Sequence, residues 1–139
     1  MPRFIKTALS FAAFLAILQS SNVRADDMSD VKAASDAYYA ALSTLDDGTA
    51  MSSVFAQAPY ITFVGPRTKD VIVGWPALKG YFMKVNTAFK KREAHLEGSA
   101  MHVSGSFAWE VGVEIGDTEM KDGSKMPVNW VATNIFEKL

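Results

Sequence analysis

The stretch "FAWEVGVEI", residues 107–115, alternates large apolar side chains with acidic or small ones along its whole length. A period of two predicts an antiparallel β-strand with one buried face and one solvated face. On this interpretation the solvated face carries Glu110 and Glu114, and the buried face is formed by Phe107, Trp109, Val111, Val113 and Ile115.

The same period continues on both sides of this strand. "KDGS", residues 121–124, predicts a turn, and the next strand has one face formed by Val128, Trp130, Ala132, Asn134 and Phe136. The preceding segment "EAHLEGSAMHV", residues 93–103, is a weaker strand that Gly98 interrupts. Three long antiparallel strands are therefore expected from about residue 90 onward.

Helical spacing dominates the region before residue 90. A first helix is predicted over 30–45, with a stripe of Val31, Ala34, Tyr38, Leu42 and Leu45. A short helix is expected over 49–55, and a third over 75–89 with Pro76 in its first turn. Two short strands, 58–66 and 69–74, lie between these helices.

Helices followed by long antiparallel strands predict an α+β fold. We expect a curved antiparallel sheet with the N-terminal helices packed over its concave face, which leaves a conical cavity for a ligand. The near-neutral net charge of −1 gives no electrostatic support for binding nucleic acid or acidic lipid.

The first 25 residues have the pattern of an export signal. Arg3 and Lys6 precede an apolar run over 8–18, and Val23-Arg24-Ala25 resembles a cleavage site before Asp26. A membrane anchor is the alternative, but the run is much shorter than the roughly 20 residues that a spanning helix needs. We expect a signal peptide over 1–25 and a mature domain over 26–139, with no membrane association.

The sequence contains no cysteine, so the mature chain relies on its core and not on disulfides. Cysteine-free export suits a bacterial periplasm or full secretion, and this is the location that we predict.

Three segments together resemble the nuclear transport factor 2-like superfamily, which includes SnoaL-like polyketide cyclases and ketosteroid isomerase. They are "YYAALSTLDDGTAMSSVFAQAPYITFVGP" at 38–66, "GWPALKGYFMKV" at 74–85, and the three long strands. The resemblance covers 30–139 and implies a cone-shaped, cystatin-like α+β barrel. Relatives carry a further strand after the position of "NIFEKL", so either the chain is truncated here or the sheet has an open edge. An open, apolar edge strand favours aggregation, so we expect a C-terminal truncation.

The resemblance to ketosteroid isomerase assigns roles to individual residues. That enzyme uses a tyrosine of the first helix as an oxyanion donor, which Tyr38 matches, while Tyr39 should lie at the edge of the stripe. The nearest match to its second donor is Asn134, whose amide can also donate a hydrogen bond. The aspartate base has no counterpart, because Thr62 or Phe63 occupies its place in "YITFVGP".

Other residues are weaker candidates. His95 and His102 are seven residues apart, which predicts opposite faces of a strand unless a bulge near Gly98 changes the register. One histidine facing the cavity could act as a base near neutral pH. We expect no metal and no cofactor, and we predict a ligand site formed by Tyr38, Phe63, Trp75, Phe82, His95, Trp109, Trp130 and Asn134.

Two functions are compatible with these features. The first is a SnoaL-like binding protein or enzyme that acts on a small hydrophobic molecule bearing a carbonyl group. The second is a non-catalytic association module, since such domains commonly pair through their sheets and a symmetric homodimer is the usual oligomer.

Overall fold

A computed structural model describes residues 27–139, and the predicted signal peptide lies outside them. The chain is helical over 27–44 (the N-terminal helix). It continues through α2 (Thr49–Ser52), β1 (Thr62–Phe63), β2 (Ile72–Val73), α3 (Trp75–Asn86), β3 (Phe89–Ser104), β4 (Phe107–Met120) and β5 (Lys125–Glu137). Within the described part of the chain, no helix is both long enough and apolar enough to cross a membrane.

Local side-chain chemistry explains where the helices begin. The Asp46 carboxylate accepts hydrogen bonds from the backbone N–H groups of Gly48 (2.9 Å) and Ala50 (2.8 Å), and so caps the start of α2. Pro76 lies in the first turn of α3, where its missing N–H leaves no helical hydrogen bond unmade. Gly48 precedes α2 with φ 91°, a backbone conformation that favours glycine.

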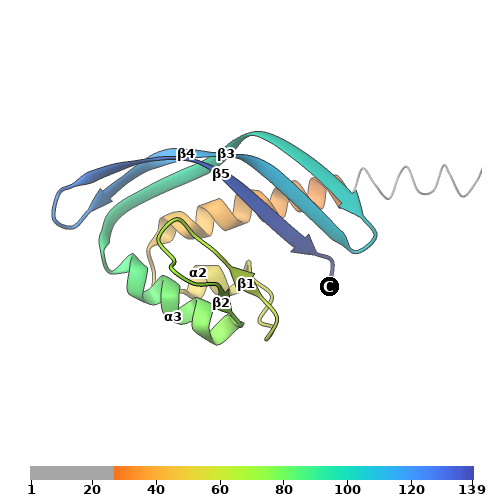
Figure 1. Ribbon diagram of the computed structural model, residues 1–139, viewed down its shortest axis with the longest axis horizontal. Helices are drawn as coiled ribbons and strands as arrows, with labels where there is room; N and C mark the ends of the chain where they lie inside the picture. Colours follow the sequence, from red (N-terminus) through yellow and green to blue (C-terminus); the bar gives the residue numbers. More distant parts are fainter. Residues whose placement is uncertain (1–26) are drawn as a thin grey trace, which may run out of the picture.

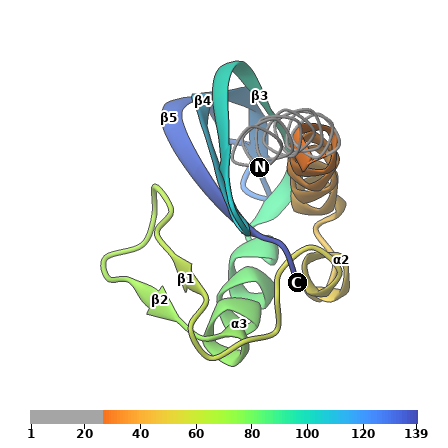
Figure 2. The same ribbon diagram turned by 90° about the vertical axis from the view of Figure 1, so that its right-hand side faces the viewer.

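The three long strands form one antiparallel sheet in the order β3-β4-β5, and β1 and β2 form a separate two-stranded sheet. Figure 1 shows the long sheet arching over α2, α3 and the β1–β2 pair. Figure 2 shows the N-terminal helix on one side beneath this arch and the β1–β2 pair on the other. The predicted α+β fold with a curved sheet and helices on its concave side is confirmed.

Glycines on β4 permit the strong curvature. A Cβ atom added at Gly112 would lie 2.8 Å from Cγ of Leu96, and one added at Gly116 would collide with the carbonyl oxygen of Glu93. Because β3 approaches the inner face of β4 so closely, any side chain at these positions would push the two strands apart.

The two faces of β4 are the reverse of the predicted assignment. Glu110 is only 4% exposed and lies on the inner face, whereas Trp109 is 42% exposed on the outer face. The outer face also exposes Phe107, Val111, Val113, Val131 and Ile135. The alternation itself is as predicted, but Ala108, Gly112 and Gly116, the small residues beside and between the glutamates, allow this face to become the concave one.

The hydrophobic core lies where α2 and α3 pack under the sheet. Met51, Leu78 and Phe82 are almost completely buried, and the cluster also contains Tyr39, Ala41, Leu42 and Trp75. Aromatic contacts connect it to the N-terminal helix, since the Phe55 ring stacks on Trp75 at 6.1 Å and also meets the Tyr38 ring edge-on at 5.8 Å. This core fixes the helices that form one wall of the cavity described next.

Candidate functional site

A cavity of about 1160 Å³ lies between the inner face of the sheet, the N-terminal helix and the β1–β2 region. Four residues of the predicted helical stripe line it, namely Val31, Ala34, Tyr38 and Leu42. The stripe therefore faces this cavity, and Leu42 also belongs to the hydrophobic core beside it. Large, mostly apolar cavities of this kind are typical of small-molecule sites.

Two polar contacts close one side of the cavity. The Tyr60 hydroxyl donates a 2.7 Å hydrogen bond to Oε2 of Glu137, and the Lys138 ammonium pairs with the carboxylate of Asp27. All four residues line the cavity, and the contacts join the end of β5 to the loop before β1 and to the N-terminal helix.

Glu114 projects from the inner face of β4 into this cavity. Its Oε2 accepts a hydrogen bond from the Tyr39 hydroxyl (3.4 Å), and its Oε1 accepts one from Nε1 of Trp130 (3.3 Å). Burial raises the pKa of the Glu114 carboxyl, while these two bonds and the charge of Arg92 oppose that rise. A carboxylate with a raised pKa in an apolar cavity is a candidate proton acceptor.

Asn134 extends the network around Glu114. Its Nδ2 donates to the Tyr39 hydroxyl at 3.4 Å, so one tyrosine connects the amide of β5 with the carboxylate of β4. Burial raises the pKa of Tyr39 to about 12, although the bond from Asn134 counteracts part of this effect. Tyr39 therefore stays protonated at neutral pH and can donate to Glu114.

The two adjacent tyrosines exchange the places that helical periodicity predicts for them. Tyr39 is only 6% exposed and packs against the sheet, whereas Tyr38 is half-buried and lines the cavity. One side of the helix packs against the sheet and a neighbouring side lines the cavity. A single stripe therefore cannot describe its burial. Among residues 27–139 the Tyr38 hydroxyl has no hydrogen-bond partner, and burial, followed by the nearby charge of Glu114, raises its pKa well above the usual value.

Five of the eight predicted site residues line the cavity: Tyr38, Phe63, Phe82, Trp130 and Asn134. Phe63 and Phe82 pack against each other with ring centroids 5.4 Å apart, and form the part of the wall next to α3. Trp75 is instead buried in the core behind them and does not line the cavity.

His95 and Trp109 lie on the outer face of the sheet, away from the cavity. A register shift between Glu97 and Ala100 brings His95 and His102 to the same face, the outer one. His95 bonds to Glu97 at 2.8 Å and is exposed, while the ring of His102 packs on Trp109 at 4.4 Å. The bulge that could have turned one histidine inward turns both outward.

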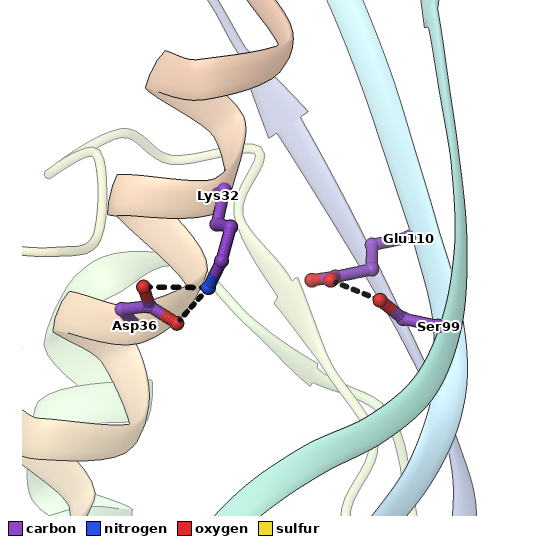
Figure 3. Close-up of polar contacts among 4 residues, drawn as sticks. All are labelled: Lys32, Asp36, Ser99 and Glu110. Carbon is purple, nitrogen blue, oxygen red and sulfur yellow. Dashed lines mark hydrogen bonds and ion pairs between the residues drawn. The ribbon is translucent and has the colours of Figure 1, made fainter.

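Glu110 lies beside the site and not in it. Figure 3 shows its carboxylate pointing from β4 toward the N-terminal helix, where Lys32 pairs with Asp36 at 2.8 Å. Its Oε1 accepts a 2.8 Å hydrogen bond from Ser99, and its buried Oε2 has no partner among the described residues. The predicted solvent exposure of Glu110 and Glu114 is therefore wrong for both, because the concave face of the sheet is covered.

No group of three or more potential metal-ligating side chains occurs within residues 27–139. Sequence reasoning overlooked Glu114 and Tyr39 as site residues. The pattern places Tyr39 at the edge of the helical stripe and Glu114 on the solvated face of its strand. The signal that could have found Glu114 is its position between Gly112 and Gly116, since a strand face with so few side chains can become the concave one.

Comparisons with solved structures define the class of fold. A nuclear transport factor 2-like superfamily protein from Salmonella enterica serovar Typhimurium superimposes with a TM-score of 0.72 and 19% identity, over 80% of this chain and 79% of that one. A candidate dehydratase of the same family from Streptomyces avermitilis gives 0.70 and 21%, over 81% and 87%. A candidate calcium/calmodulin-dependent protein kinase II association domain from Xanthomonas campestris gives 0.67 and 22%, over 79% and 76%.

These likenesses show a nuclear transport factor 2-like fold. The model of the SnoaL-like domain family matches residues 31–139, and this chain belongs to that family. A search of curated proteins gives no match to this chain.

Proposed function

We propose that this domain binds a small hydrophobic molecule bearing a carbonyl group in the cavity beneath the sheet, and that Glu114 moves a proton on it. The observation that carries the proposal is a half-buried carboxylate, held by Tyr39 and Trp130, in an otherwise mainly apolar cavity. Apolar walls favour a hydrophobic ligand, and the few polar groups would orient it.

The chemistry that this arrangement supports is proton abstraction from the carbon next to a carbonyl. Ionised Glu114 would accept the proton, and negative charge would develop on the carbonyl oxygen as an enolate forms. The Tyr38 hydroxyl, protonated and without a partner in residues 27–139, and the Asn134 amide would donate hydrogen bonds to that oxygen. Return of the proton to another carbon gives isomerisation, and attack by the enolate carbon on a second carbonyl gives cyclisation.

We also propose that the domain acts after export, in the periplasm or outside the cell. The support is the pattern of residues 1–25, with Arg3 and Lys6 before the apolar run and a Val23-Arg24-Ala25 sequence that resembles a cleavage site. Mass spectrometry of the protein from a periplasmic extract should find a mature N-terminus at Asp26, and an intact Met1 in the cytoplasm would contradict export.

The ligand can be sought directly by native mass spectrometry of the mature domain purified from its own host. We expect a co-purifying apolar carbonyl compound, and we expect the double variant Tyr38→Phe/Asn134→Ala to lose it. A protein that is empty and binds no member of a panel of hydrophobic ketones would contradict the proposal.

Proton transfer can be tested separately from binding. Phenylacetone in deuterated buffer should exchange the protons next to its carbonyl faster with the wild-type protein, and Glu114→Gln should slow this by about a hundredfold. Glu97→Gln, which removes an exposed carboxylate from β3, is the matched control and should leave exchange unchanged. Equal exchange rates for wild type and Glu114→Gln would rule out Glu114 as the base.

A second candidate function is a homodimeric association module. The observation that favours it is the apolar outer face of the sheet, where Trp109, Val113 and Val131 are exposed. Contiguous exposed apolar surface often marks an interface, and two copies could pair symmetrically through it. Sedimentation should find a wild-type dimer that Val113→Arg converts to a monomer, whereas a wild-type monomer would contradict this function.

A further inference from the structure

Arg92 is a buried cation without an acidic partner among the described residues. It is only 8% exposed, and its Nε and Nη2 donate to the carbonyl oxygen of Leu42 at 2.9 and 2.7 Å. Nη2 also donates to Oδ1 of Asn86 at 2.9 Å. Both acceptors are uncharged, and residues 27–139 provide no ion pair for this guanidinium, although buried charges are normally paired.

The contacts of Arg92 leave one of its nitrogens available. Nε and Nη2 serve a structural purpose, since Leu42 belongs to the last turn of the N-terminal helix, where carbonyl groups lack helical partners. Nη1 makes no hydrogen bond with any described residue, and Arg92 lines the cavity. The charge is therefore fixed in place at the cavity wall with donor capacity to spare.

A second arginine and a tyrosine hydroxyl lie at the same end of the cavity. The guanidinium carbons of Arg67 and Arg92 lie over the ring of Phe89, at 5.4 and 5.0 Å from its centroid. The one hydrogen bond that Arg67 makes within residues 27–139 goes to the sulfur of Met126, and the Tyr81 hydroxyl makes none there. Both arginines lower the pKa of Tyr81 against the effect of burial, so both charges act on that hydroxyl.

We propose that this end of the cavity binds the carboxylate of an apolar organic acid, with Arg67, Arg92 and Tyr81 as its donors. Guanidinium groups bind carboxylates through short, charge-assisted hydrogen bonds, often two at once. The proposal rests on the proposed function, because it adds an anionic head group to the hydrophobic carbonyl compound. The ligand class then becomes that of apolar oxoacids.

The head group would also affect the proposed base. Without a ligand, the charge of Arg92 lowers the pKa of Glu114 and favours its ionised form. A ligand carboxylate bound to Arg92 would offset part of this lowering. The pKa of Glu114 would then rise further toward neutral pH, which makes it a more effective base. Acid ligands would thus increase the reactivity of the site that binds them.

Two fluorescent probes with nearly the same aromatic body test the head-group site. Anilinonaphthalene sulfonate carries an anion that stands in for a carboxylate, and phenylnaphthylamine lacks it. We expect the wild-type protein to bind the sulfonate about tenfold more tightly than the neutral probe. Decanoate should displace the bound sulfonate, and decanol at the same concentration should not.

Variants should avoid Arg92, whose loss would disturb the end of the N-terminal helix. Arg67→Gln should weaken sulfonate binding by about fivefold and Tyr81→Phe by about threefold, with neutral-probe affinity unchanged. Lys69→Gln is the matched control, because it removes the same charge from the same β1–β2 connection at a residue that does not line the cavity. It should change neither affinity.

The outcomes separate this inference from the proposed function. If neither probe binds, the cavity takes no such ligand and both proposals fail. If both probes bind equally and Arg67→Gln changes nothing, the head-group site is overturned while the cavity site stands. Val113→Ser, on the outer face, should leave sulfonate binding unchanged, and a loss there would place the probe on the outer face and overturn the head-group site.

Discussion

The inner face of β4 carries Glu110, Glu114 and three small residues, whereas its outer face carries Phe107, Trp109 and valines. In an ordinary half-buried sheet the apolar face would be the inner one. Here the inner face lines a cavity and lies against a helix, so polar groups can occur there if they are hydrogen-bonded. The apolar outer face, in contrast, has no element of residues 27–139 packed on it, which suits contact with a second chain.

The curvature of the inner face can be tested by adding a single methyl group. Gly116→Ala should lower the free energy of unfolding by about 3 kcal/mol, because the new Cβ would collide with the Glu93 backbone. Gly80→Ala in α3 is the control: nothing lies within 4 Å of its new Cβ, so it should stabilise the protein by about 0.5–1 kcal/mol. Urea unfolding measures both, and equal effects would contradict the tight approach of β3 to β4.

Substituting one valine on each face of β5 compares how much each face contributes to stability. Val128 is 4% exposed on the inner face and Val131 is 73% exposed on the outer one. Val128→Ala should destabilise the domain by about 2 kcal/mol, and Val131→Ala by less than about 0.5 kcal/mol. If Val131→Ala costs as much as Val128→Ala at concentrations where the protein dimerises, the outer face is itself buried in the dimer.

Glu110 should be replaceable by an apolar side chain of similar size. Its Oε2 is buried without a partner within residues 27–139, so Glu110→Met should stabilise the protein by about 1 kcal/mol. Glu97→Met, at an exposed position of β3, should change thermal stability little. A loss of stability in Glu110→Met would show that the Ser99 hydrogen bond and the nearby charge of Lys32 outweigh the cost of burying Oε2.

The raised pKa of Glu114 predicts how stability depends on pH. Because the folded state favours the protonated carboxyl, the contribution of Glu114 to stability is fully present below the ordinary pKa of a glutamate and is lost as pH rises through the folded pKa. Relative to wild type, Glu114→Gln should therefore gain stability on going from mildly acidic to neutral solution. Unfolding free energies measured across this range would reveal the trend, and a parallel course for both proteins would contradict it.

The fold was predictable to the extent that it depends on local periodicity. The helices, the three long strands and their antiparallel order follow from spacing alone, as does the set of residues in the helical stripe around Tyr38, four of which line the cavity. Periodicity states which residues share a face, but it cannot decide which face is covered, and this is why Glu114 was placed outside. His95 and His102 share the outer face because the pairing of β3 with β4 shifts register between Glu97 and Ala100. The position of such a bulge depends on the partner strand, so residue spacing within β3 could not predict it.

The cavity side closed by Tyr60–Glu137 and Asp27–Lys138 has a consequence for kinetics. Those contacts involve exposed polar and charged groups, whose strength falls with ionic strength, whereas the apolar walls are insensitive to salt at such concentrations. If ligands pass there, added salt should speed both entry and escape of an uncharged molecule while its Kd stays constant. Stopped-flow mixing with phenylnaphthylamine would measure this residence time, and rates that do not respond to salt would place the route elsewhere.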